Sequence, residues 1–141
     1  MAKRCYFAYG SNMDVSQMKC RCASATLLQV ATLKDHQLLI NTRGFATVVP
    51  NEGYFVYGVV WSISGEDEAE LDRYEGVSSG HYERSEVGVD LSDGTSEQAL
   101  VYIATDCSPG KPRPGYLEKI IAAGEAHGLP QSYLEELSRC L

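Results

Sequence analysis

The segment Tyr54-Phe55-Val56-Tyr57-Gly58-Val59-Val60-Trp61 decides the fold class of this chain. Aromatic and β-branched residues dominate it, and both kinds favour a buried strand. We therefore predict that residues 54–61 form the central, most buried strand of a sheet. Gly58 interrupts the run, which marks either a β-bulge or a close approach of another backbone.

On the N-terminal side, residues 4–9 form a short β-prone run that ends at Gly10-Ser11-Asn12. Asp14 and Gln17 then match a capping box, which predicts a helix. Residues 26–49 hold short apolar bursts separated by Lys34-Asp35 and a polar turn at 41–44, with a further turn at 50–53. This pattern predicts two or three strands.

On the C-terminal side, the capping box that begins at Ser64 predicts a helix that runs to Tyr74 or Glu75, with Gly76 as its left-handed stop. Residues 82–91 and 98–105 are strand-like, and the Asp-Gly pair between them favours a hairpin. A helix opened by Pro112-Arg113-Pro114 and broken near Gly128, and a last helix over 132–140, complete the chain.

These elements predict an α+β fold that occupies residues 1–141 as a single domain. We expect a curled mixed, mostly antiparallel sheet that approaches a small barrel, with about four short helices around it. A doubly wound sheet is disfavoured, because strands and helices do not alternate between Thr26 and Trp61.

Composition excludes several classes of partner. The net charge of −7 disfavours nucleic acid, which needs clustered Lys and Arg. No stretch approaches the ~20 apolar residues of a membrane span, so we expect a soluble cytoplasmic protein without a membrane partner. The histidines are too scattered for a metal site, and we predict neither a metal nor a cofactor. The cysteines are interpreted as reduced thiols: Cys5, Cys20, Cys22, Cys107 and Cys140.

Glu75 is the most informative single residue. A carboxylate in the last turn of a helix faces the negative end of the helix dipole, which raises its pKa. This makes Glu75 a candidate general base. Two alternatives stay open: an exposed acid tethered to Arg73 or Lys119, and a role for Asp72, which shares a helix face with Glu75.

The loop Tyr9-Gly10-Ser11-Asn12 lies between a predicted strand and a predicted helix. Its glycine allows close backbone approach, and free N–H groups at such a turn suit an oxyanion or a carboxylate. An ordinary turn with an N-cap is the simpler alternative. Ser11 as a nucleophile is weakly supported, since no G-x-S-x-G motif surrounds it and no histidine, among His36, His81 and His127, has a recognisable spacing.

Three segments together resemble the γ-glutamylcyclotransferase family. Residues 6–13 look like its Tyr-Gly-Ser-Asn signature, and residues 71–82 resemble its Glu-Gly and Gly-x-Tyr region. Residues 116–133, with Gly128-Leu129-Pro130, are similar to the closing region of animal members. The resemblance therefore spans nearly the whole chain.

The resemblance implies that Glu75 is a catalytic acid/base in the conversion of γ-glutamyl amines into 5-oxoproline, without a metal. It also implies a possible homodimer. The residues implied to hold the substrate are Tyr6, Phe7, Ala8, Tyr9, Gly10, Ser11, Asn12, Gly76, Tyr82, Tyr102 and Tyr116. Two other functions stay open: a relative that releases a specialised amine, and a binding module that has lost turnover.

Overall fold

The computed structural model describes residues 3–139. In chain order the elements are β1 (Arg4–Ala8), the short 3₁₀ helix η1 (Ser11–Met13), α1 (Val15–Arg21), β2 (Thr26–Ile40), β3 (Ala46–Ile63), α2 (Gly65–Tyr74), β4 (Tyr82–Leu91), β5 (Ser96–Ala104), α3 (Tyr116–Ala126) and α4 (Gln131–Ser138).

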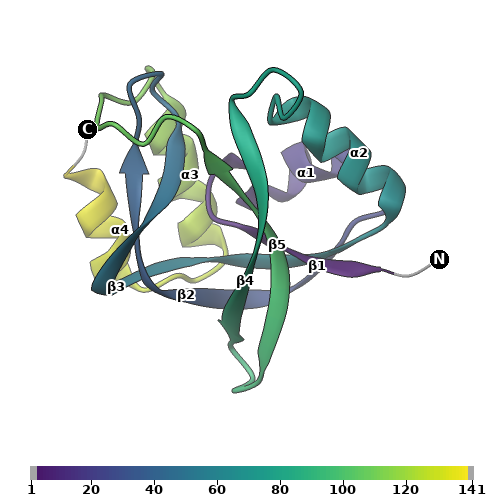
Figure 1. Cartoon of the computed structure of the whole chain (residues 1–141). Coiled ribbons are helices and arrows are strands. Elements are labelled where there is room, and N and C mark those ends of the chain that lie inside the picture. The colour runs from purple at the N-terminus through teal and green to yellow at the C-terminus, as the bar shows by residue number, and fades with distance from the viewer. Residues whose placement is uncertain (1–2, 140–141) are drawn as a thin grey trace.

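The strands form a closed barrel in the order β1-β3-β2-β4-β5 (Figure 1). The ring closes where β1 pairs with β5, with Cys5 opposite Ala99 and Tyr6 opposite Leu100, and this contact is parallel. The other pairings are antiparallel. The predicted α+β fold, with a mixed sheet curled into a small barrel, is confirmed.

Strand β3 is the predicted central strand, and it pairs with β1 on one side and β2 on the other. From Val56 to Trp61 every residue is buried except the half-buried Tyr57, whereas Tyr54 and Phe55 are 42% and 46% exposed. Within the segment predicted as the most buried strand, burial therefore begins at Val56. A Cβ at Gly58 would overlap the carbonyl oxygen of Ala8, so this glycine marks a close backbone approach.

Strands β2 and β3 together form one long ribbon, where the sequence suggested breaks at Lys34-Asp35 and at residues 50–53. These two breaks lie opposite each other in the ribbon. Asp35 has a positive φ of 58°, and its side chain accepts a hydrogen bond of 3.0 Å from Gly53 N–H. The two irregularities therefore form a shared bulge, and both strands continue past it.

The four α-helices within residues 3–139 confirm the predicted number, and they flank the barrel on two sides, with α3 and α4 on one side and α1 and α2 on the other (Figure 1). The Ser64 capping box and the left-handed Gly76 are present as predicted. Helix α3 begins later than predicted, at Tyr116, after the left-handed Gly115. The predicted end of the last helix at Cys140 lies outside the described residues.

The predicted capping box of α1 forms only in part. Asp14 caps the helix by accepting a hydrogen bond from Ser16 N–H at 3.2 Å. Gln17 instead donates to the side chain of Asn12 at 3.2 Å. The helix therefore begins where predicted, but Gln17 is committed to the loop that precedes it.

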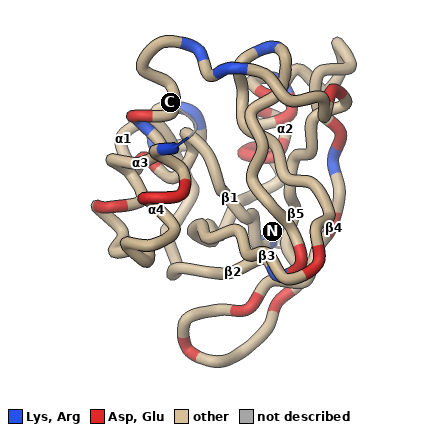
Figure 2. Tube along the Cα trace, turned by 90° about the vertical axis from the view of Figure 1, so that its left-hand side faces the viewer, with Lys and Arg blue, Asp and Glu red and all other residues tan. Residues whose placement is uncertain are grey.

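Charge is unevenly distributed over this acidic protein. Figure 2 shows Lys and Arg on the loops at the upper end, near the β2–β3 turn and the segment after β5, and Asp and Glu on the hairpin at the lower end. That hairpin joins β4 to β5 and carries Asp90 and Asp93. None of the helices within residues 3–139 is long and apolar enough to cross a membrane.

Candidate active site

A cavity of about 310 Å³ opens at one end of the barrel. Its walls come from both ends of the chain and from the loops between. It is lined by Tyr6, Tyr9, Gly10, Ser11, Asn12, Gln17, Arg21, Arg43, Phe45, Ala46, Tyr74, Glu75, Gly76, His81, Tyr82, Tyr102, Tyr116 and Lys119. Ten of the twelve residues predicted for the site are thus brought to a single cavity.

Helix α2 delivers Glu75 to this cavity. Glu75 caps the C-terminal end of the helix, where its N–H donates to Leu71 C=O at 2.8 Å. Gly76 then turns the chain with a φ of 66°, and the ring of His81 lies so close that a Cβ at Gly76 would approach it to 2.8 Å. The turn therefore needs glycine both for its conformation and for its contact with His81.

The environment of Glu75 suits proton transfer near neutral pH. Burial raises the pKa of its carboxyl from 4.5 to about 7, against an opposing effect of the positive Arg21. Among the described residues that line the cavity, Glu75 is the one acid. The expected upward pKa shift is therefore present, and desolvation is its leading cause.

The alternatives for Glu75 and Asp72 separate in the structure. Arg73 pairs with Glu70, and no ion pair to Glu75 forms within residues 3–139. Asp72 does not line the cavity. Its carboxylate instead accepts from the Tyr102 hydroxyl at 2.7 Å and from Arg84 at 3.0 Å. Of the two carboxylates, Glu75 is the one that faces the cavity.

Asn12 holds the loop after β1 in place. Its side-chain oxygen accepts from Arg21 at 2.7 Å, and its amide nitrogen donates to the Tyr6 hydroxyl at 2.9 Å. Because arginine can only donate, the Asn12 oxygen must face Arg21 and the nitrogen must face Tyr6. The backbone oxygen of Asn12 also accepts from the buried Trp61 indole at 3.1 Å. This loop is therefore rigidly tied to β1, α1 and β3.

Three tyrosines of the cavity use their hydroxyl protons within the protein. Tyr102 donates to Asp72, and Tyr9 donates to the Tyr102 backbone oxygen at 2.6 Å. Tyr82 donates to the backbone oxygen of Ala46 at 2.7 Å. Burial raises the pKa of all three phenols, so they stay neutral. Towards a ligand, these hydroxyls can act as acceptors only.

Two further tyrosines of the cavity, Tyr6 and Tyr116, donate their hydroxyl protons to no group within residues 3–139. The hydroxyl of Tyr6 accepts from Asn12, and that of Tyr116 accepts from Ala46 N–H at 3.1 Å. Burial raises the pKa of Tyr116 to about 12, and that of Tyr6 further. Both hydroxyls are thus free to donate to a negatively charged group of a ligand.

Phe7 and Ala8 do not line the cavity, although the family resemblance included them. Both are buried, at 0% and 1% exposure. Neighbouring side chains of a strand point to opposite faces, so Phe7 turns away from Tyr6 and lies against Gly58 instead. These two residues support the sheet beneath the site.

Sequence reasoning did not place the cations in the cavity, although it considered Lys119 as a partner of an exposed Glu75. Arg21 lies at the end of α1, Arg43 in the β2–β3 turn, and Lys119 in the first turns of α3. Arg21 could have been noticed from its spacing to Gln17, since residues four apart lie on one helical face. Arg43 and Lys119 carry no local signal, because only the closure of the barrel brings them to the cavity.

Ser11 lines the cavity, but the structure offers it no matched base. His127 contacts the backbone oxygen of Met13 at 2.6 Å, and His36 contacts that of Lys34 at 2.8 Å. His81 shares the cavity with Ser11, without a hydrogen bond to it. Within residues 3–139, no three His, Cys, Asp or Glu side chains gather as metal ligands.

Known proteins resemble this chain both in sequence and in three-dimensional structure. The γ-glutamylcyclotransferases of mouse and human are each 34% identical over 142 aligned residues, which cover 94% of this chain and 76% of theirs. The chain belongs to the γ-glutamylcyclotransferase family. Residues 55–137 also match the AIG2-like family. The matched segment runs from within β3 into α4.

Solved structures extend this family assignment to the fold. A structure of a γ-glutamyl cyclotransferase superposes with a TM-score of 0.91 at 32% identity and covers 99% of this chain and 89% of its own. A Bacillus subtilis protein, YkqA, has a TM-score of 0.86 at 23% identity and covers 99% of this chain and 54% of its own. The latter likeness concerns the fold alone.

Proposed function

We propose that this chain is a γ-glutamylcyclotransferase that converts γ-glutamyl amino acids into 5-oxoproline and the free amino acid. The observation that carries the proposal is the single carboxylate, Glu75, in a cavity of tyrosine hydroxyls and cations. The reaction needs no protein nucleophile, because the substrate's own α-amine attacks its γ-carbonyl once the site holds the two groups together.

Glu75 serves as the acid/base in this proposal. Its carboxylate takes a proton from the α-ammonium, the freed amine forms a C–N bond to the γ-carbonyl carbon, and the original amide C–N bond breaks. Glu75 then returns the proton to the departing amine, and the second proton of the attacking nitrogen passes to the released amine, which leaves a neutral lactam and an ammonium group. A pKa of about 7 suits both roles at neutral pH, since the group exchanges a proton readily in either direction.

The developing oxyanion needs donors. The hydroxyls of Tyr6 and Tyr116 retain their protons, and Gly10 and Ser11, which carry backbone N–H groups, line the same cavity. We propose that these groups bind the oxyanion and the substrate α-carboxylate, and the division between them stays a prediction. A well-placed oxyanion donor is worth about 10²–10³ in rate.

The charge of the cavity supports an amino acid as the leaving group. Arg21, Arg43 and Lys119 line the cavity together with one carboxylate, in a protein whose net charge is −7. A γ-glutamyl amino acid carries two carboxylates and fits this balance, whereas a γ-glutamyl polyamine would add positive charge to it. Since glutathione is itself a γ-glutamyl peptide, we also propose a cytoplasmic role in glutathione metabolism.

A panel of substrates tests the proposal. We expect 5-oxoproline from γ-glutamyl amino acids, a slower reaction with a neutral γ-glutamyl alkylamine, and the slowest reaction with a γ-glutamyl polyamine. Binding without release across the panel would identify a non-catalytic module. Preference for the polyamine would identify a specialised amine as the substrate. Assembly as a homodimer stays a separate prediction, which light scattering can test.

A further inference from the structure

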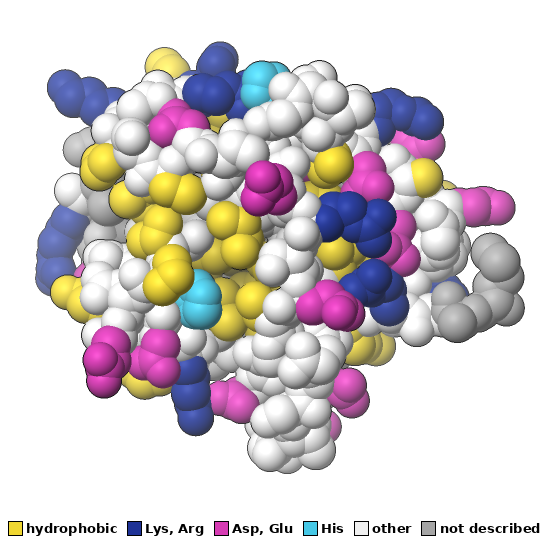
Figure 3. Space-filling model, in the orientation of Figure 1, with side chains coloured by type: hydrophobic (Ala, Val, Ile, Leu, Met, Phe, Trp, Pro, Cys, Tyr) yellow, Lys and Arg dark blue, Asp and Glu magenta, His cyan; other side chains and the backbone are white. Residues whose placement is uncertain are grey.

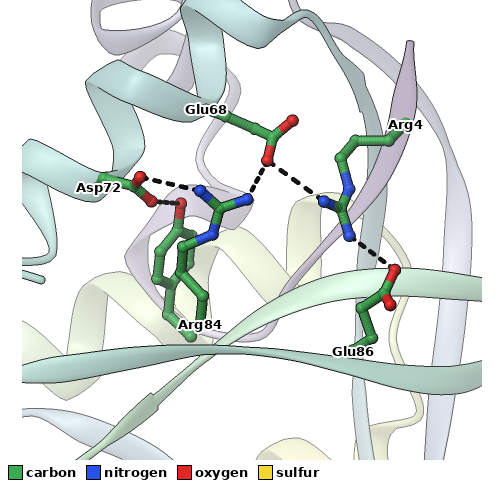
Figure 4. A network of polar contacts seen from close by, with 6 residues as sticks. Arg4, Glu68, Asp72, Arg84 and Glu86 are labelled. Atoms are coloured by element: carbon green, nitrogen blue, oxygen red, sulfur yellow. Dashed lines mark hydrogen bonds and ion pairs between the residues drawn. The ribbon is translucent and has the colours of Figure 1, made fainter. Parts of the chain in front are cut away.

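A polar network outside the cavity joins β1, β4 and α2 (Figure 4). Arg84 of β4 pairs with Glu68 and, at 3.0 Å, with Asp72, two acids one turn apart on α2. Arg4 of β1 joins Glu68 at 3.3 Å and Glu86 at 2.9 Å. Figure 3, which has the orientation of Figure 1, shows charged side chains of both signs next to one another on the right half of the molecule.

Helix α2 depends on this network because its apolar attachment is small. Leu71 is its one buried apolar residue, and the other buried residue, Asp67, belongs to the capping box at the N-terminal end. The side chains of Glu68 and Asp72 are 17% and 29% exposed, so solvent screens their ion pairs less than those of a fully exposed pair. The network therefore holds the C-terminal half of the helix against the barrel.

Asp72 connects the network to two walls of the cavity. Its carboxylate accepts from the hydroxyl of Tyr102, whose residue lines the cavity from β5. Its backbone oxygen accepts from Val77 N–H at 3.0 Å, which closes the turn that contains Glu75 and Gly76. Asp72 thus connects the turn that contains Glu75 to Tyr102 in the wall of the cavity (the Tyr102 wall). Arg84 in turn fixes the orientation of the Asp72 carboxylate.

We infer that Arg84 and Asp72 are positioning residues for Glu75: the Arg84–Asp72 pair fixes the distance and orientation of the Glu75 turn relative to the Tyr102 wall. The inference rests on the proposed role of Glu75 as acid/base. Neither Arg84 nor Asp72 lines the cavity, so both act through the groups that they hold. A displacement near 1 Å of a catalytic group can cost about 100-fold in rate.

The test compares Arg84→Met with wild type, with kcat and KM measured for a γ-glutamyl amino acid. Methionine keeps an extended side chain but cannot bridge Glu68 and Asp72. We expect kcat to fall by about 10- to 100-fold with a KM within about 3-fold, because the substrate-binding groups stay in place while the acid/base moves. Arg84→Lys should recover part of kcat, since lysine keeps the charge but lacks the two-pronged geometry.

Arg73→Met is the matched control. Arg73 lies on the same helix next to Asp72, but its side chain is 74% exposed and pairs with Glu70. It should leave kcat unchanged. A second readout is salt: kcat of wild type should fall as ionic strength rises, and kcat of Arg84→Met should not, because the ion pairs are already lost.

A lower melting temperature with unchanged kcat in both Arg84 variants would overturn the inference, because the network would then be structural only. If Arg84→Met does not fold, unchanged kcat in Arg84→Lys would overturn it equally. Glu75→Gln, measured in parallel, separates the two ideas. Activity in Glu75→Gln contradicts the proposed function itself, whereas an inactive Glu75→Gln beside a fully active Arg84→Met contradicts the positioning role alone.

Discussion

Arg21 and Glu75 line the same cavity from the C-terminal ends of two different helices, and the positive charge of Arg21 opposes the effect of burial on the Glu75 carboxyl. Both positions are ones that helix dipoles influence: the cation is favoured at such an end and the carboxylate is not. The pKa of about 7 is therefore a balance between desolvation and one nearby guanidinium.

The first prediction concerns this balance. Removing the positive charge with Arg21→Met should raise the pKa of Glu75, because less charge stabilises its ionised form. The pH midpoint of kcat/KM should move from near 7 to a higher pH. Arg21→Lys should keep the midpoint near that of wild type, since the charge remains. The same midpoint in Arg21→Met and wild type would show that Arg21 does not act on Glu75.

The second prediction concerns the shape of the pH profile of wild type. If the ionised form of Glu75 starts the reaction, kcat/KM should rise about tenfold per pH unit below the pKa and level off above about 7. Initial rates of 5-oxoproline formation between pH 5 and 9 would test this. A profile that is flat through this range would exclude Glu75 as the titrating base.

The third prediction concerns the residue itself. Glu75→Gln keeps the shape of the side chain but cannot accept a proton, so kcat should fall by about 10²–10⁴-fold, the usual contribution of acid/base catalysis. Glu70→Gln on the same helix serves as control, because Glu70 pairs with Arg73 outside the cavity. Retained activity in Glu75→Gln would move the catalytic role to another group.

The fourth prediction links Glu75 to stability. Its folded pKa is raised, so the folded protein binds this proton more tightly than the unfolded chain, and that stabilisation is present below pH 4.5 and lost as pH rises towards 7. The change from 4.5 to about 7 corresponds to about 3 kcal/mol. The free energy of unfolding of Glu75→Gln, measured with urea, should therefore rise relative to that of wild type by up to this amount between pH 4.5 and 8. If the difference in unfolding free energy between the two proteins does not vary with pH, the raised pKa of Glu75 is contradicted.

The fifth prediction concerns the barrel beneath the site. Gly58→Ala should destabilise the protein by about 1–3 kcal/mol or more, since the new methyl overlaps the Ala8 carbonyl and contacts the Phe7 ring. Gly65→Ala is the control, because a Cβ there meets no atom within 4 Å and the residue begins helix α2. Equal stability of the two variants would show that β1 can move away from β3.

Local chemistry explains which parts of the fold were predictable. The Ser64 capping box, the Gly76 stop and the Asp-Gly hairpin are contained within a few residues each, and all three were predicted. The breaks assigned at Asp35 and near Gly53 were wrong for a non-local reason. Each looks like a turn by itself, and only their pairing across the ribbon makes them one bulge.

The candidate site divides in the same way. Glu75 and the loop at residues 9–12 have signatures along the chain, and both lie in the cavity. Whether Asp72 or Glu75 faces that cavity depends on Tyr102 and Arg84, which are distant in sequence. Arg43 and Lys119 arrive from a turn and a helix with no motif of their own. Positions set by long-range pairing leave no trace in a short window of sequence.

The parallel contact between β1 and β5 has a consequence for how the protein folds during its synthesis. The barrel can close only when Cys5 of β1 pairs with Ala99 of β5. The lining of the cavity also requires Tyr116 and Lys119, which are synthesised later still. During synthesis most of the chain must leave the ribosome before the site can exist. Pairings this far apart in sequence close slowly. The nascent chain thus spends its synthesis with an open β1 edge and no active site.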